Sequence, residues 1–276
     1  MTLKSIEIEK FDMKKIRFNP QKSQGPVIVI AGRRNTGKSF LVRDLLYYHQ
    51  DIPIGAVISL FEPFAGFYSE FVPKCFIHDE CNNTIIENLL KPNQSKKICI
   101  FDDSGYRGQE LSRLSFNKML VITKQYSSLV PSNVWDRADY TFILKENINQ
   151  HRKIIYEKYA DIFPNFDVFC TIMDQCTENY ECLVIDNNVK SDRLDEKIFW
   201  YKANEHKYFK LGSPELYDKK EIKRFKLKLE KQILSIVLDK KIALGTKQDI
   251  NEILNTIGYM ESDDDMESDD DTDHDE

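Results

Sequence analysis

Short apolar runs recur along the first two hundred residues, separated by segments of mixed polarity. The runs are rich in valine, isoleucine and phenylalanine, and polar residues do not alternate with them. Continuous apolar runs of this length are typical of strands that are buried on both faces of a sheet. They predict strands at 26–31, 55–60, 97–103, 118–123, 140–144, 181–186 and 197–202.

Several segments between the runs have apolar residues at helical spacing. Leu41, Leu45 and Tyr48 recur in this way and predict a helix over 39–48. Similar patterns predict helices at 80–90, 147–159 and 166–173, whereas 61–68 and 91–95 contain the glycine or proline typical of a loop and a turn. Alternating strands and helices predict an α/β fold with a central, mostly parallel sheet.

The segment between the first predicted strand and the first predicted helix has the pattern of a phosphate-binding loop. It fits G-x-x-x-x-G-K-[ST], and its residues are Gly32, Arg33, Arg34, Asn35, Thr36, Gly37, Lys38 and Ser39. Glycines allow backbone N–H groups to face an anion, the lysine charge reaches the β- and γ-phosphates, and the serine hydroxyl binds Mg²⁺. A chance match in a surface loop is the alternative, but the flanking strand and helix favour a site for ATP and Mg²⁺.

Two carboxylates end the predicted strand at 97–103. In phosphoryl-transfer sites such a strand end brings one carboxylate to Mg²⁺ and the next toward the γ-phosphate. We therefore assign Asp102 to the metal and Asp103 to orienting or deprotonating the attacking water. The alternative is a strand-terminating turn, because Asp103 is followed by serine and glycine.

Two further polar residues lie near the ends of predicted strands. Gln125 follows the strand at 118–123, where its amide is expected beside the two aspartates and able to sense the γ-phosphate. Arg137 precedes the strand at 140–144, and an arginine at a subunit edge can act in trans on a neighbour's nucleotide. A surface amide and an ion pair with Asp136 or Asp139 are the respective alternatives.

Composition indicates a soluble, intracellular, globular protein. The 276 residues are 41% hydrophobic and 30% charged, enough for one large domain with an appendage or for two small domains. No apolar run approaches the roughly 18 residues of a membrane helix, and the first 20 residues lack a secretory signal. The spacing of the six cysteines does not match a zinc motif, so free thiols in a reducing compartment are the preferred interpretation and a metal site the alternative.

Charge divides unevenly along the chain. The last 16 residues hold 11 acids and no lysine or arginine; without them, 34 acidic residues face 39 basic ones, a formal charge of +5. Basic residues at 219–231 line one side of a predicted amphipathic helix, which is either a surface for DNA phosphates or an ordinary solvated face. The acidic tail at 261–276 cannot bury a core and is expected to be disordered.

The phosphate-binding loop and its helix resemble those of the genome-packaging ATPases of large nucleocytoplasmic DNA viruses, in the FtsK–HerA superfamily. The resemblance continues through 71–80, 100–103 and 139–146, and is closest in 166–170, 173–186 and 198–203. It covers most of 26–205. We therefore expect a leader at 1–25, a P-loop ATPase domain at 26–205, a helical basic extension at 206–260 and the acidic tail at 261–276.

The resemblance implies a RecA-like fold, a homo-oligomeric ring and ATP-driven movement of double-stranded DNA into a capsid. It implies capsid or portal-vertex proteins as partners, and the host cytoplasm at the virus assembly site, or the virion, as location. Carried over by position, Gly32, Gly37, Lys38 and Ser39 bind nucleotide and Mg²⁺, and Asp102 and Asp103 form the second acidic motif. Gln125 matches the family's glutamine after the following strand.

The sequence departs from the family in two places. A helix ending in Asn-Gly-Arg-His usually separates the acidic motif from the glutamine strand, and 104–118 is too short to contain it. The family's arginine after the proline at Pro131 aligns with Trp135, and Arg137 lies two positions later. Both departures favour an alternative, a degenerate ATP-binding member with a structural or regulatory role in virion assembly. A small-molecule P-loop kinase is a further alternative that would need an arginine-rich lid and an acceptor site.

Overall fold

The computed structural model describes residues 8–19, 24–91, 96–103, 114, 118–125, 134, 136–191, 193–218 and seven residues between 223 and 236. The chain divides into two compact units, Met1–Ile222 and Lys223–Glu276. The elements below belong to the first unit. In the second unit the seven described residues are helical, and Lys223, Lys226 and Lys231 are exposed. The acidic tail and most of the predicted basic helix lie outside the described residues.

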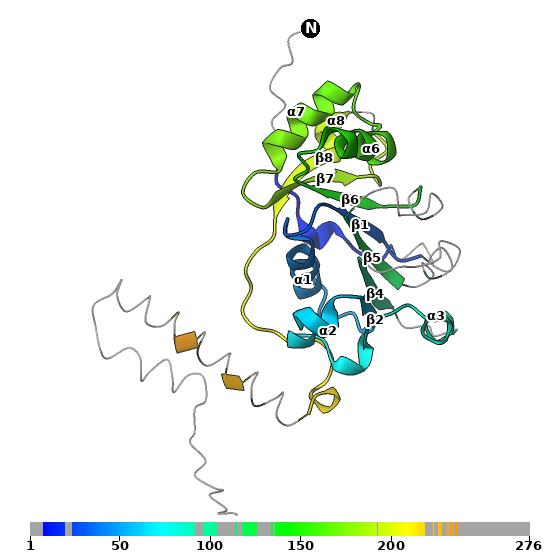
Figure 1. The fold of residues 1–276 in the computed structure, drawn as a ribbon, viewed down its shortest axis with the longest axis vertical. Helices are drawn as coiled ribbons and strands as arrows, with labels where there is room; N and C mark the ends of the chain where they lie inside the picture. The colour runs from blue at the N-terminus through cyan, green and yellow to red at the C-terminus, as the bar shows by residue number, and fades with distance from the viewer. Residues whose placement is uncertain are drawn as a thin grey trace, which may run out of the picture. The chain divides into compact units, whose positions relative to one another are not determined.

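An eight-stranded sheet, in the order β3-β2-β4-β5-β1-β6-β7-β8, organises the first unit (Figure 1). Its strands are β1 (Val27–Ala31), β2 (Ile54–Ser59), β3 (Ile77–His78), β4 (Lys97–Asp102), β5 (Lys118–Lys124), β6 (Tyr140–Leu144), β7 (Glu181–Asp186) and β8 (Ile198–Lys202). Every neighbouring pair from β3 to β6 is parallel, whereas β6–β7 and β7–β8 are antiparallel. The predicted mostly parallel sheet is therefore confirmed; the two-residue edge strand β3 was not predicted.

Helices cover both faces of the sheet, as the continuous apolar runs predicted. The helices are α1 (Lys38–Tyr48), α2 (Glu62–Ala65), α3 (Asn83–Leu90), α6 (Asn149–Tyr159), α7 (Phe166–Cys176) and α8 (Leu194–Lys197). Ile28 and Ile30 of β1 pack in one cluster with α1, whereas Val27 and Val29 pack in the other with α3, α6 and α7. Figure 1 shows α1 and α3 on opposite sides of the strands. Successive side chains of a strand point to opposite faces, so β1 joins both layers.

The prediction of a loop at 61–68 is wrong, because α2 begins in this segment and a short 3-10 helix, Tyr68–Glu70, follows it. Pro63 lies in the first turn of α2, where a missing N–H leaves no helical hydrogen bond unmade. Gly66 ends the helix with a φ of 60°, and its N–H donates to the Glu62 carbonyl at 2.9 Å. The proline and the glycine therefore mark the two ends of a helix.

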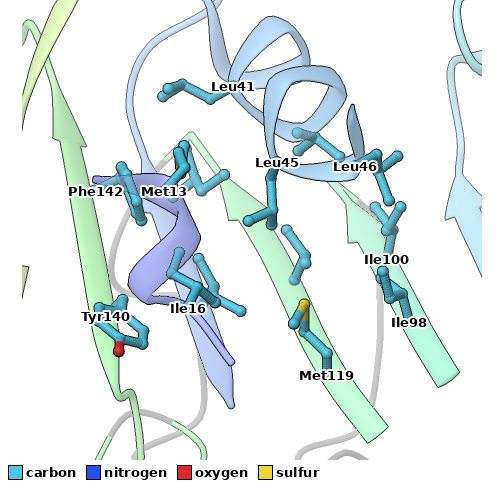
Figure 2. Packing of buried hydrophobic residues seen from close by; sticks show 14 of the residues in the cluster. Met13, Ile16, Leu41, Leu45, Leu46, Ile98, Ile100, Met119, Tyr140 and Phe142 are labelled. Atoms are coloured by element: carbon cyan, nitrogen blue, oxygen red, sulfur yellow. The ribbon is translucent and has the colours of Figure 1, made fainter. Parts of the chain in front are cut away.

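The N-terminal segment, which the sequence set apart as a leader, packs on the sheet. The Phe11 N–H donates to the Trp200 carbonyl at 2.8 Å, and the Trp200 N–H donates to the Glu9 carbonyl at 3.0 Å. A 3-10 helix, Met13–Lys15, follows, and Met13 and Ile16 are buried among α1, β5 and β6 side chains (Figure 2). Phe11, Met13 and Ile16 are therefore part of the core of the first unit.

We expect Ile16→Val to lower the free energy of unfolding by about 1 kcal/mol, because it removes one methyl group from a fully buried side chain. Chemical denaturation measures this loss. Ile148→Val is the matched control, because Ile148 is 40% exposed and its variant is expected to change stability little. Equal stability of both variants and the wild type would show that the segment does not pack in solution.

Residues 203–217, beyond the last strand, also pack on the first unit. The buried Asp44 carboxylate of α1 accepts hydrogen bonds from the Tyr201 hydroxyl at 2.6 Å and from the Asn204 N–H at 3.2 Å, and it also pairs with His206. The His206 ring stacks on Tyr47 with 3.7 Å between ring centroids. This network holds the chain after β8 against the helix that follows the phosphate-binding loop.

Among the residues that the structure describes, none of the helices combines the length and apolar character that crossing a bilayer requires. All six cysteines lie in the described ranges and none of them is in a disulfide, with Cys99, Cys176 and Cys182 buried.

Candidate nucleotide site

The phosphate-binding loop connects the carboxyl end of β1 to the first turn of α1 (Figure 1). Gly37 caps α1 with a φ of 103°, a conformation that side chains with a Cβ rarely adopt. Gly32 is required for space: a Cβ there would lie 2.8 Å from Leu144 Cβ and from Thr36 Oγ1. The Gly32 N–H donates to the Lys124 carbonyl at 3.0 Å and so joins the loop to β5.

The intervening loop residues are exposed or half-buried. The Thr36 hydroxyl donates to the Arg33 carbonyl at 2.8 Å, which closes the loop on itself. Asn35 has a φ of 61°, and the Arg34 guanidinium lies 5.3 Å from the centre of the Phe61 ring. The two arginines and Asn35 therefore face solvent at the rim of the site.

Lys38 points into the loop. Its ammonium group donates to the carbonyls of Gly32 at 3.0 Å and Arg33 at 2.9 Å, and its Nζ lies 3.7 Å from Asp103 Oδ2. Burial lowers the pKa of Lys38, and the nearby carboxylates of Asp103 and Asp102 oppose that shift. A bound phosphate would therefore lie near Asp103 and would replace the two loop carbonyls as the partner of the Lys38 ammonium group.

Asp102, the last residue of β4, is buried in a set of hydroxyl donors. Its carboxylate accepts hydrogen bonds from Ser39 Oγ at 3.3 Å, from the Tyr68 hydroxyl at 2.9 Å and from the Thr123 hydroxyl. The register of the sheet explains the position of Thr123, because Asp102 pairs with Thr123 on β5. The expected approach of Ser39 and Asp102 is therefore present.

Asp103 follows the strand with a φ of 49°, which turns its carboxylate toward Gln125. The Gln125 backbone N–H donates to Asp103 Oδ1 at 3.1 Å, and its side-chain amide donates to Oδ2 at 2.9 Å. The Asp103 N–H donates in turn to Thr123 Oγ1 at 3.1 Å. Because β4 and β5 are parallel neighbours, their carboxyl ends bring the two predicted side chains into direct contact.

Three residues of the site were not predicted from the sequence. Tyr68 is fully buried, and burial together with Asp102 holds its pKa well above the usual value, so the hydroxyl remains a donor. The Glu62 carboxylate fixes Tyr68 by accepting from its backbone N–H at 3.0 Å. At the end of β5, burial lowers the pKa of Lys124, while Asp103 and Asp102 act in the opposite direction. Of these three residues, only Lys124 could have been suspected from the sequence, because it directly precedes the predicted site residue Gln125.

A pocket of about 280 Å³ lies over these residues, lined by Lys38, Ser39, Asp102, Asp103 and Gln125 together with α2 and Tyr68. The donor set fits Mg²⁺, which is usually held by one or two carboxylates with substrate phosphates and water. Here Asp102 provides the carboxylate and Ser39 the hydroxyl. Within the described residues, no cluster of three or more His, Cys, Asp or Glu could hold a metal by itself.

Arg137 is not brought to this site. It lines a separate hollow of about 230 Å³ with Arg17, Val27, Asp139 and Tyr140, at the amino ends of β1 and β6. The phosphate-binding loop lies at the opposite, carboxyl end of β1, so Arg137 does not serve the nucleotide of its own chain. Trp135 and Pro131, which bear on the family's arginine, lie outside the described residues, as does nearly all of 104–117.

Comparisons with known proteins identify viral relatives. Protein L437 of Acanthamoeba polyphaga mimivirus is 31% identical over 246 residues, covering 79% of this chain and 84% of L437. Protein 088R of Invertebrate iridescent virus 3 is 31% identical over 236 residues, covering 75% of this chain and 90% of 088R. No protein-family model matches the chain.

Among solved structures, the genome packaging NTPase B204 from Sulfolobus turreted icosahedral virus 2, in complex with ATP-gammaS, matches with a TM-score of 0.47. The two chains are 17% identical, and the match covers 68% of this chain and 100% of B204. The sequence relatives, which are more similar, determine the assignment. The chain belongs to the family of viral proteins that includes mimivirus L437 and iridescent virus 088R.

Proposed function

We propose that the protein is a P-loop ATPase that drives viral double-stranded DNA into the capsid. The observation that carries the proposal is the arrangement around Asp103, whose carboxylate lies 3.7 Å from Lys38 Nζ and accepts two hydrogen bonds from Gln125. A cation for the transferred phosphoryl group and an oriented carboxylate for the attacking water are the two parts that phosphoryl transfer to water requires.

Each residue has a separate task in the proposed reaction. Ser39 and Asp102 would hold Mg²⁺, which would neutralise charge on the phosphates. Lys38 exchanges its contacts with the loop carbonyls for the phosphate oxygens. Asp103 accepts a hydrogen bond, and then a proton, from the attacking water, while Gln125 keeps the carboxylate in one orientation.

The DNA-packaging role is supported by the family resemblance over 26–205 and by the charge of the chain. The body without its acidic tail carries a formal charge of +5, and the lysines described at 223, 226 and 231 are exposed. Basic surfaces bind DNA by neutralising phosphates. In a ring, the hollow around Arg137 would face a neighbouring subunit, where Arg137 would act in trans on that subunit's nucleotide.

ATP hydrolysis measured with and without double-stranded DNA tests the proposal. We expect slow turnover of the protein alone and faster turnover with DNA, with the stimulation falling as salt rises because counterions compete for the phosphates. Nucleotide binding without turnover under either condition would support the degenerate structural or regulatory alternative. The short 104–118 segment and the tryptophan at position 135, where the family has an arginine, favour that alternative. Phosphate transfer to a small acceptor would support a kinase.

Removing the Tyr68 hydroxyl is expected to weaken the use of Mg²⁺. The Tyr68→Phe variant keeps the ring but loses a 2.9 Å hydrogen bond to the proposed metal ligand Asp102. Loss of such an outer hydrogen bond typically costs about tenfold or more in metal affinity. A titration of ATPase activity with Mg²⁺ should therefore show a half-maximal concentration about tenfold higher.

Tyr217→Phe provides the matched control for Tyr68→Phe. Tyr217 is also buried and donates to the Leu211 carbonyl at 2.7 Å and to the Phe71 carbonyl at 3.1 Å. Its variant loses a buried hydroxyl outside the site and should leave the Mg²⁺ dependence unchanged. An equal shift in both variants would mean that general destabilisation, not Asp102, controls the response.

A further inference from the structure

A second, larger hollow of about 660 Å³ opens beside the phosphate pocket. The two share Asn35, Lys38, Ser39, Ala65 and Phe67, so they form one continuous depression. The phosphate pocket of about 280 Å³ is smaller than the usual range for small-molecule sites. A nucleotide with its phosphates in the first pocket would therefore extend its remaining atoms into the second.

An aromatic side chain stands at one wall of this hollow. Tyr180 is 70% exposed, whereas the large aromatic ring of a tyrosine is usually buried to a greater extent in a folded protein. Its ring lies beside the amino end of α1, because a Cβ placed on Gly37 would be 3.9 Å from Tyr180 Cδ1. The ring is thus next to the loop that would hold the phosphates.

The backbone that carries Tyr180 is in an unusual conformation. Asn179 and Tyr180 have φ values of 50° and 64°, and a bulky residue rarely adopts a positive φ. The turn joins α7 to β7, and the Glu181 N–H closes it by donating to the Glu178 carbonyl at 2.8 Å. Backbone strain of this kind is often retained where a side chain serves a ligand.

The rest of the hollow is apolar, with a polar rim. Phe40 is 58% exposed, and its ring centre lies 5.5 Å from that of Phe67. Asn204 and Glu205 supply an amide and a carboxylate. The Asn204 backbone is fixed to α1 through Asp44, so this rim is part of the rigid unit. Aromatic faces with a few polar groups at the edge are the surroundings that a flat heterocycle requires.

We propose that the base of the bound nucleotide lies in this hollow and stacks on Tyr180, with Phe40 and Phe67 covering the apolar surface nearby. The inference rests on the proposed ATPase function and extends it to recognition of the base. The rim groups Asn204 and Glu205 line the same hollow, where their side-chain oxygens could accept from the amino group of a purine. The Asn204 amide N–H₂ already donates to the Tyr201 hydroxyl at 2.9 Å. Tyr180 is then a binding residue that takes no part in the hydrolysis step.

Calorimetric titration of the full chain with a non-hydrolysable ATP analogue and with inorganic tripolyphosphate, both with Mg²⁺, separates base from phosphate recognition. Base–aromatic stacking is worth about 1–3 kcal/mol, so Tyr180→Ala should weaken the analogue roughly tenfold or more. Tyr180→Phe keeps the ring and should bind as the wild type does. None of these variants should change tripolyphosphate binding, which Lys38→Ala should abolish. Phe64→Ala is the matched control, because Phe64 is 90% exposed and does not line the hollow.

Each outcome decides the inference. Weaker binding of the analogue alone in Tyr180→Ala, restored in Tyr180→Phe, supports it. Equal losses for the analogue and tripolyphosphate would make Tyr180 a support of the phosphate loop and overturn it, as would no loss at all. If the wild type binds neither ligand, the proposed ATPase function fails together with the inference, a result distinct from failure of base recognition alone.

Discussion

Replacing Lys38 by alanine is expected to reduce the ATPase kcat about a hundredfold to a thousandfold, with or without DNA. The variant removes the buried ammonium group that lies 3.7 Å from Asp103 and replaces it with a methyl group. A preorganised cation in a site of low water content stabilises the charge that develops on the transferred phosphoryl group, and loss of one such group has effects of this size. Steady-state phosphate release measures the change.

Lys153→Ala is the control for Lys38→Ala, because Lys153 is an exposed lysine on α6 away from the site. It removes the same charge from the chain and should hydrolyse ATP as the wild type does. Thermal unfolding of both variants shows whether the fold is retained. Undiminished turnover in Lys38→Ala would mean that a contaminating enzyme or a different site hydrolyses the ATP, and the assignment of this loop would be withdrawn.

Site residues whose positions depend on the direction of the strands could be predicted from the sequence. Asp103 and Gln125 both follow apolar runs, and runs without alternation indicated strands covered on both faces. Parallel neighbours end at the same edge, so two polar residues after two such strands had to lie near each other. The end of the sheet at which Arg137 lies was not predicted from the sequence; in the structure Arg137 lies at the amino ends of β1 and β6, away from the loop.

Site residues whose positions depend on packing between segments far apart in the sequence could not be predicted. Tyr68 reaches Asp102 across 34 positions, and nothing in the local sequence distinguishes it from other tyrosines. Pro63 and Gly66 are as typical of a loop as of the two ends of a short helix, so their presence did not reveal α2. The helix nevertheless positions Tyr68, because the carboxylate of Glu62, its first residue, accepts a hydrogen bond from the Tyr68 N–H.

The N-terminal segment presents a related difficulty. Charged residues separate Phe11, Met13 and Ile16, and a segment with so many exposed positions does not have the pattern of a core strand or helix. Its burial depends on backbone hydrogen bonds with Trp200, nearly two hundred residues away. This pairing requires the completed sheet, so the periodicity of the local sequence does not predict it.

Replacing Asp103 by asparagine is expected to separate turnover from binding. The asparagine has the same shape but cannot take the proton of the attacking water, and its amide N–H₂ opposes one of the two Gln125 donors. Loss of a general base typically costs about a hundredfold to ten-thousandfold in rate. We therefore expect kcat to fall by this amount in phosphate-release assays, while the affinity for the ATP analogue changes little.

The contrast with Asp102→Asn makes the division of roles between the adjacent aspartates testable. If Asp102 holds Mg²⁺ beside Ser39, its variant should lose the Mg²⁺ dependence of analogue binding, whereas Asp103→Asn should retain it. Asp136→Asn, which alters an exposed aspartate, should affect neither quantity. A loss of binding in Asp103→Asn equal to that in Asp102→Asn would assign both carboxylates to the metal. The attacking water would then need another base, and the hydrogen bonds from Gln125 would serve only to hold a metal ligand in place.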